Sequence, residues 1–201
     1  MFALVESGSI TKMLNGNKGI QIGDLKYPRA IYTLWTEAER NAIGIYTVEY
    51  DDSNKKDEQW YINTNQSYAF GSGKVTATYG TATAKAHADT LYTAQDETDG
   101  LGTEGEVATR GLKYNLIQTV KAQAANELAK TDWYITRKSE KNTAIPSAIT
   151  THRDAVRSKQ AAMETAITNA SDTPALETLY TYTRQEDGST TRPLGELPTL
   201  E

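Results

Sequence analysis

The chain has 201 residues, a formal net charge of −5 and no cysteine. The absence of cysteine excludes disulfides and cysteine-ligated metal sites, and the acidic balance with scattered basic residues argues against a nucleic-acid surface. Hydrophobic residues make up 38% of the chain and Tyr is the main aromatic residue, which is typical of proteins that complete their burial against neighbours. An elongated domain is the equally weighted alternative.

The first residues predict no targeting segment. Glu6 and Ser7 follow the first apolar residues too closely for a signal-peptide core. No apolar run approaches the roughly 20 residues that cross a bilayer. We therefore expect a soluble, unsecreted protein that does not enter a membrane.

Short strands are predicted first. Ser7-Gly8 is a tight-turn sequence between two strand-like runs, and residues 15–19 supply a second turn. The expected strands are residues 2–5, 10–14 and 20–22.

One short helix is predicted next, over residues 37–43. Thr36 and Glu39 have the spacing of a capping box, and Gly44 offers a left-handed stop. Trp35 precedes the cap, and we expect its ring to pack inward.

Further strands complete a β-rich N-terminal domain over residues 1–84. They are expected at residues 45–50, 60–62 and 74–79, with a hairpin turn at Gly71-Ser72-Gly73. Residues 85–105 combine acidic residues with Thr, Gly and Ala and have little to bury. They are predicted to be a linker or an extended arm.

Residues 106–183 are predicted to form a helical module. An apolar stripe recurs every four residues and ends at Thr131-Asp132, and Pro146-Ser147 opens a second helix with Ser147 as its N-cap. Asp172-Thr173-Pro174 opens a short third helix, and residues 184–201 are a tail. The stripe residues are Leu112, Leu116, Val120, Ala124 and Leu128, and those of the second helix are Ile149, Val156, Met163 and Ala170. The fold class expected from these elements is α+β, and the narrow stripes suit an intramolecular bundle as well as an oligomeric coil.

No residue pattern indicates catalysis, a cofactor or a metal ion. His87 and His152 have no acidic partner at ligand spacing, and residues 95–106 miss the first ligand of a calcium loop. Trp35 and Trp60 could stack on sugar rings in a glycan-binding module, but packing in a core or an interface is the stronger interpretation. We expect no enzymatic activity.

Two segments resemble bacteriophage tail proteins. Residues 128–138, Ile145-Pro146 and residues 152–157 resemble a C-terminal module with a helix, a Thr-Asp-Trp turn, an Arg-containing strap, an Ile-Pro break and a Tyr-Arg-x-x-Val/Leu-Arg helix. His152 stands where that family usually has Tyr. Residues 2–6 and 35–46 are similar to the opening module of tail-fibre and tail-assembly proteins.

The resemblance implies roles for four residues of the helical module. Asp132 would cap or stop the first helix, and Trp133 would wedge between the helices. Arg153 and Arg157 would share one helix face and meet acidic partners. For all four, packing that stabilises the fold is the simpler alternative to direct contact with a partner.

The resemblance also implies a setting. The chain is expected to be a structural virion protein of a bacteriophage, made in the host cytoplasm and placed on the tail or its fibres. Its partners would be other virion proteins and further copies of itself. The alternatives are an assembly chaperone for the tail or fibre, and a module that binds a host receptor or glycan.

Overall fold

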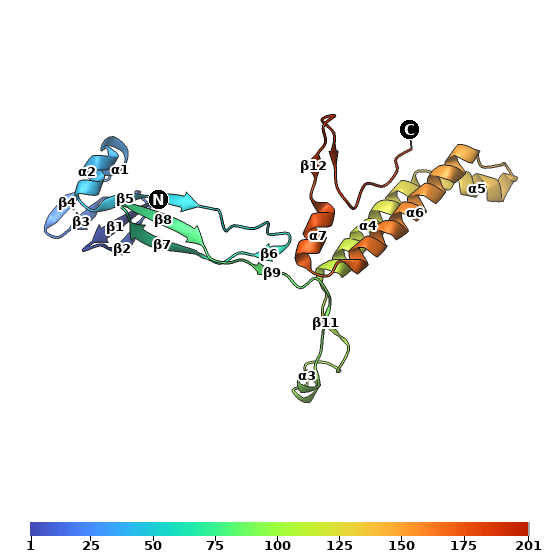
Figure 1. Cartoon of the computed structure of the whole chain (residues 1–201), viewed down its shortest axis with the longest axis horizontal. Helices are drawn as coiled ribbons and strands as arrows, with labels where there is room; N and C mark the ends of the chain where they lie inside the picture. The colour runs from blue at the N-terminus through green and yellow to red at the C-terminus, as the bar shows by residue number, and fades with distance from the viewer. Residues whose placement is uncertain (201) are drawn as a thin grey trace. The chain divides into compact units, whose positions relative to one another are not determined.

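The computed structural model describes residues 1–200 and has the α+β fold that the sequence predicts. The chain divides into two compact units, residues 1–83 and residues 84–201 (Figure 1). The N-terminal unit is built on a curved sheet, and the C-terminal unit is built on helices. Each unit has its own core and is described separately below.

The N-terminal unit contains a five-stranded sheet in the order β2-β1-β5-β8-β7. The β5–β8 pair is parallel, whereas β1–β2, β1–β5 and β7–β8 are antiparallel. Smaller two-stranded pairs are β3–β4 and β6–β9. The bounds of the strands are β1 Phe2–Glu6, β2 Ser9–Leu14, β3 Ile20–Ile22, β4 Leu25–Tyr27, β5 Ile45–Asp51, β6 Tyr61–Ile62, β7 Gln66–Gly71, β8 Lys74–Tyr79 and β9 Thr83–Ala84.

The two hairpins of the main sheet turn on Ser-Gly pairs, as the sequence predicts. Ser7 and Gly8 have φ of 50° and 78°, and Ser72 and Gly73 have φ of 52° and 76°. Two consecutive positive φ values give the turn that matches the right-handed twist of the adjoining strands.

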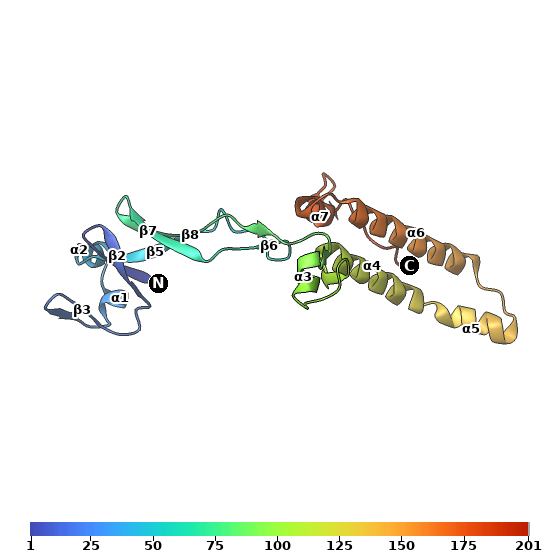
Figure 2. The same cartoon turned by 90° about the horizontal axis from the view of Figure 1, so that it is seen from below.

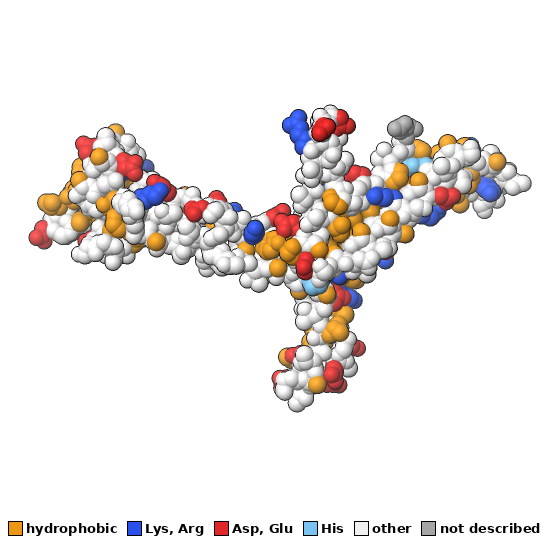
Figure 3. Space-filling view, in the orientation of Figure 1, with side chains coloured by type: hydrophobic (Ala, Val, Ile, Leu, Met, Phe, Trp, Pro, Cys, Tyr) orange, Lys and Arg blue, Asp and Glu red, His pale blue; other side chains and the backbone are white. Residues whose placement is uncertain are grey.

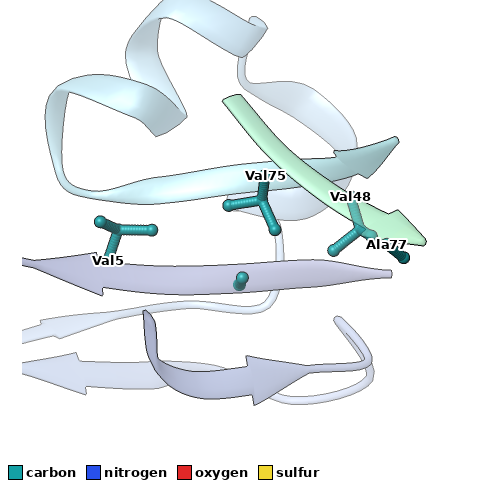
Figure 4. Packing of buried hydrophobic residues seen from close by; sticks show 5 residues of the cluster. Val5, Val48, Val75 and Ala77 are labelled. Atoms are coloured by element: carbon teal, nitrogen blue, oxygen red, sulfur yellow. The ribbon is translucent and has the colours of Figure 1, made fainter. Parts of the chain in front are cut away.

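Both faces of the main sheet are covered by apolar side chains. One face carries a cluster of small residues in which Val5, Val48, Val75 and Ala77 pack together (Figure 4). Because side chains alternate along a strand, Leu4 points to the opposite face, where it packs with Ile31 and Ile45.

Two short helices lie between β4 and β5: α1 (Ile31–Leu34) and α2 (Glu37–Ala42). The predicted capping box of α2 is confirmed, since Thr36 and Glu39 exchange hydrogen bonds in both directions. Gly44 has φ +82° and lies so close to β1 that an added Cβ would be 2.6 Å from the Val5 carbonyl oxygen. The helix α1 was not predicted.

The C-terminal unit is centred on two long helices that pack along each other (Figure 2). Their shared core contains Val120 and Ala124 from one helix and the predicted seven-residue repeat, Ile149, Val156, Met163 and Ala170, from the other segment. The helices of this unit are α3 Ala94–Thr98, α4 Leu112–Ala129, α5 Asp132–Lys141, α6 Ser147–Asn169 and α7 Thr173–Tyr180, and its remaining strands are β10 Thr90–Leu91, β11 Val107–Thr109, β12 Thr183–Arg184 and β13 Thr190–Thr191.

The structure departs from the sequence predictions for this unit at four places. Residues 132–141 form α5 rather than a strap, and the N-cap of α6 is Pro146, so that Ser147 is the first helical residue. Residues 85–105, predicted to be a linker or an extended arm, include β10 and α3. The strand β10 pairs with β11 to form a hairpin. After α7, β12 and β13 form another hairpin, and the buried Leu194 donates its backbone N–H to Leu179.

Candidate protein-contact site

The turn between α4 and α5 is organised around one buried guanidinium. Arg153, on α6, is only 8% exposed. Its Nη1 donates to three oxygens of the turn: the Leu128 carbonyl oxygen at 2.8 Å, Thr131 Oγ1 at 2.7 Å and Asp132 Oδ1 at 2.8 Å. A buried cation is costly unless it is paired and hydrogen-bonded. Arg153 therefore holds α6, the end of α4 and the start of α5 together.

Asp132 has a different place from the one implied by the resemblance. The helix α4 ends at Ala129, with Lys130 as its C-cap, and Asp132 is the first residue of α5. A carboxylate in the first turn of a helix is favoured by the helix dipole. Asp132 thus begins α5, and its ion pair with Arg153 fixes where α5 leaves the turn.

The helix α5 lies outside the core of its unit. Within α5, whose ten residues are all described, none is buried. Trp133 is 52% exposed and Ile135 is 43% exposed. The prediction that Trp133 wedges between the helices is wrong, because the turn at Thr131 directs Asp132 to Arg153 and leaves the neighbouring indole facing outward.

Aromatic rings and a guanidinium form one surface on α5. The ring centroids of Trp133 and Tyr134 are 3.8 Å apart. The Cζ atom of Arg137 lies 4.8 Å from the Trp133 centroid and 5.2 Å from that of Tyr134. Such cation–π contacts stabilise a guanidinium over ring faces. The surface formed by Trp133, Tyr134 and Arg137 is hereafter called the α5 aromatic surface.

A second polar cluster lies between the C-terminal end of α4 and the N-terminal part of α6. Oε1 of Glu127 lies 3.3 Å from Nε2 of His152, and both side chains are nearly buried. Lys130 binds the other oxygen of Glu127, and the backbone N–H of Leu200 donates to Oε1 at 3.4 Å. The hydrogen bond from Lys130 holds the pKa of Glu127 below its usual value. Glu127 therefore connects α4 with α6 and with the C-terminal segment.

The six residues singled out in the sequence do not form one site. Arg153, Asp132 and Trp133 meet at the α4–α5 turn, and Arg157, one turn along α6, is exposed and donates to Asp154 at 3.3 Å. Trp35 and Trp60 belong to the N-terminal unit. The ring centroids of Trp35 and Tyr27 are 5.9 Å apart in an edge contact. Trp60 is 3% exposed, so its ring is not accessible to solvent.

Sequence reasoning missed Glu127, Arg137 and the role of Thr131. Glu127 sits on the buried side of α4, three residues after Ala124, and a buried carboxylate in an apolar stripe signals a partner. Arg137 follows Trp133 by four residues, the spacing at which helical side chains meet. The Glu127 signal was already available, because a helix over this segment was predicted from the sequence. The Arg137 signal becomes visible only when α5 is known to be a helix.

Comparisons with protein-family models, with curated proteins and with solved structures found no match for this chain. No helix within residues 1–200 is long and apolar enough to span a membrane. The same residues contain no group of three or more His, Cys, Asp or Glu side chains placed to hold a metal ion.

Proposed function

We propose that this chain is a structural protein of a bacteriophage particle, placed on the tail or its fibres, and that it acts through protein–protein contacts. Other virion proteins and further copies of the chain are its proposed partners, and the virion, after synthesis in the host cytoplasm, is its proposed location. No catalytic step, nucleic acid or membrane is part of this proposal.

The observation that carries the proposal is the arrangement at the α4–α5 turn. The residues on which the resemblance rests come from segments more than 20 positions apart, yet Arg153 binds Asp132 beside Trp133. The turn holds α5 so that the α5 aromatic surface faces outward. Trp, Tyr and Arg are the residue types enriched at the centres of protein interfaces. This supports a contact role for the helical module.

The test is mass spectrometry of purified particles together with imaging of particles from which the gene has been deleted. A structural protein is expected at a constant ratio to the other tail proteins, and its deletion should remove a defined density. Absence from the particle, with the chain bound to tail or fibre protein in infected cells, would replace this proposal with an assembly chaperone. Binding of the isolated chain to host cells would favour the receptor-binding alternative.

A further inference from the structure

The helix α5 carries cations that form no ion pair with any other residue between 1 and 200. Arg137, Lys138 and Lys141 follow Trp133 and Tyr134 at intervals of three and four residues, so they form one stripe with the α5 aromatic surface. Within residues 1–200 these three side chains form no ion pair, and the buried Nε of Arg137 has no hydrogen-bond partner. The stripe therefore offers positive charge beside exposed aromatic rings.

A second surface of the same unit has the opposite character. Residues 93–106, hereafter the acidic arm, begin with a capping box between Thr93 and Asp96, continue through α3 and return to β11. No Lys or Arg occurs between residues 86 and 109. Leu101, at the far side of α3, is 63% exposed. The carboxylates of the acidic arm, none of which is ion-paired within the described residues, are Asp96, Glu97, Asp99, Glu104 and Glu106.

The two surfaces lie at opposite ends of α4. The arm joins the first turn of α4, where Gly111 donates to Asp89, and α5 follows the last turn. The 18 residues of α4 separate them by about 27 Å at 1.5 Å per residue. Figures 1 and 2 place α3 and α5 at different ends of α4, and Figure 3 shows acidic side chains over the arm. The arm of one copy therefore does not meet its own α5.

We propose that the acidic arm of one copy docks on α5 of a second copy. The arm's carboxylates would pair with Arg137, Lys138 and Lys141, while Leu101 covers the exposed Trp133. Single exposed ion pairs contribute little, but several complementary charges around an apolar contact select the partner and its orientation. Because the two surfaces differ, the contact is head-to-tail. It leaves one acidic arm and one α5 surface free to bind further copies.

This inference deepens the proposed partnership between copies, and it rests on that part of the proposed function alone. It is tested on the full chain by sedimentation velocity over a range of concentrations. One variant reverses two charges on the helix (Lys138→Glu with Lys141→Glu) and another reverses two charges on the arm (Glu104→Lys with Glu106→Lys). All four side chains are exposed. The control is Lys26→Glu with Lys56→Glu, two exposed lysines in the N-terminal unit.

The wild-type chain and the control are expected to associate with concentration, and more weakly as salt rises above about 0.1 M. Each reversed variant should associate roughly tenfold more weakly, because one of its two surfaces has lost two complementary charges and gained two opposing ones. Mixing the two reversed variants should restore association, since each supplies the charge that the other lacks. Circular dichroism would verify that both variants are folded.

A wild-type chain that stays monomeric at every concentration would overturn the inference. So would reversed variants that associate as the control does, or a mixture that associates no better than either variant. These outcomes leave the particle-composition test unaffected, because a virion protein can be held by other proteins without contacting its own copies. Absence of the chain from particles, conversely, leaves the sedimentation result standing.

Discussion

Arg153 shows how one side chain can determine the course of a whole segment. Its guanidinium satisfies oxygens at the end of α4 and at the start of α5 while its own backbone lies in α6. Thr131, which accepts one of these bonds, is 1% exposed. Without the guanidinium, the buried hydroxyl oxygen of Thr131 would lose the donor from which it accepts.

Replacing Arg153 with Met is expected to lower the free energy of unfolding by about 1–3 kcal/mol, because the buried Thr131 hydroxyl loses its donor and the ion pair with Asp132 is lost. Urea denaturation of the full chain measures this change. Arg157→Met is the matched control, since this exposed arginine pairs only with Asp154, and its effect should stay within about 0.5 kcal/mol. Equal effects of the two substitutions would contradict the role assigned to Arg153.

Glu127 gives a prediction about pH. The hydrogen bond from Lys130 lowers the pKa of Glu127 in the folded chain, so its ionised form stabilises the fold above the ordinary carboxyl pKa of about 4.3. This contribution is lost as pH falls through the lowered pKa. We therefore expect Glu127→Gln to melt at a lower temperature than wild type at neutral pH. Thermal melts from pH 7 downward should converge in the acid range, and a constant difference would argue against this origin.

At the scale of elements, local sequence signals define the short helix α2. Both hydrogen bonds of the capping box between Thr36 and Glu39 are present. The bonds that the N–H and the hydroxyl of Thr36 donate to the Glu39 carboxylate lower the pKa of Glu39. We expect Thr36→Ala to reduce the free energy of unfolding by about 1 kcal/mol, because a free amide at the helix start loses its acceptor. Chemical denaturation tests this, with the exposed Glu37→Ala as the control. A loss no larger than that of the control would count against the cap.

Two tryptophans distinguish a core element from a contact element. Trp60 is 3% exposed and Trp133 is 52% exposed. We expect Trp60→Ala to cost about 3–5 kcal/mol of unfolding free energy, as large-to-small changes in a core do, and Trp133→Ala to cost less than about 1 kcal/mol. Denaturation curves of the two variants provide the comparison. A large loss for Trp133→Ala would mean that α5 is packed inside its unit.

The helix α5 was not predicted from the sequence. Thr131 to Ile135 combine aromatic and β-branched residues, which favour strands, and they carry no apolar stripe. The helix forms nevertheless, since Asp132 lies in its first turn, Lys138 and Lys141 lie in its last turn, and Asn142 ends it with φ 51°. These end signals were present in the sequence, but the strand-favouring residues between them prevented the prediction of a helix.

At the scale of the whole molecule, two cores imply two steps of unfolding. Ile45 belongs to the N-terminal unit and Ile167 to the C-terminal unit, and both are fully buried. Substituting either with Ala should destabilise its own unit by about 2–5 kcal/mol. Calorimetry of the full chain is expected to resolve two transitions, each shifted by one substitution only. A single transition that both substitutions shift equally would show that the units unfold together.

The sequence by itself determined the features whose physical cause is local. The Ser7-Gly8 and Ser72-Gly73 turns need consecutive positive φ values, the capping box needs residues three apart, and the repeat from Ile149 to Ala170 needs only helical spacing. The order of strands followed by helices gave the α+β class for the same reason.

Only the tertiary structure decided which distant residues meet. The parallel pairing of β5 with β8 joins strands separated along the chain by two others, β6 and β7. The contacts of Arg153 with the α4–α5 turn and of Glu127 with His152 depend on how α6 lies along α4. Side-chain spacing along a helix indicates which residues share a face but carries no information about the opposing helix. The resemblance implied that Trp133 lies between the helices, and the folded chain leaves it exposed.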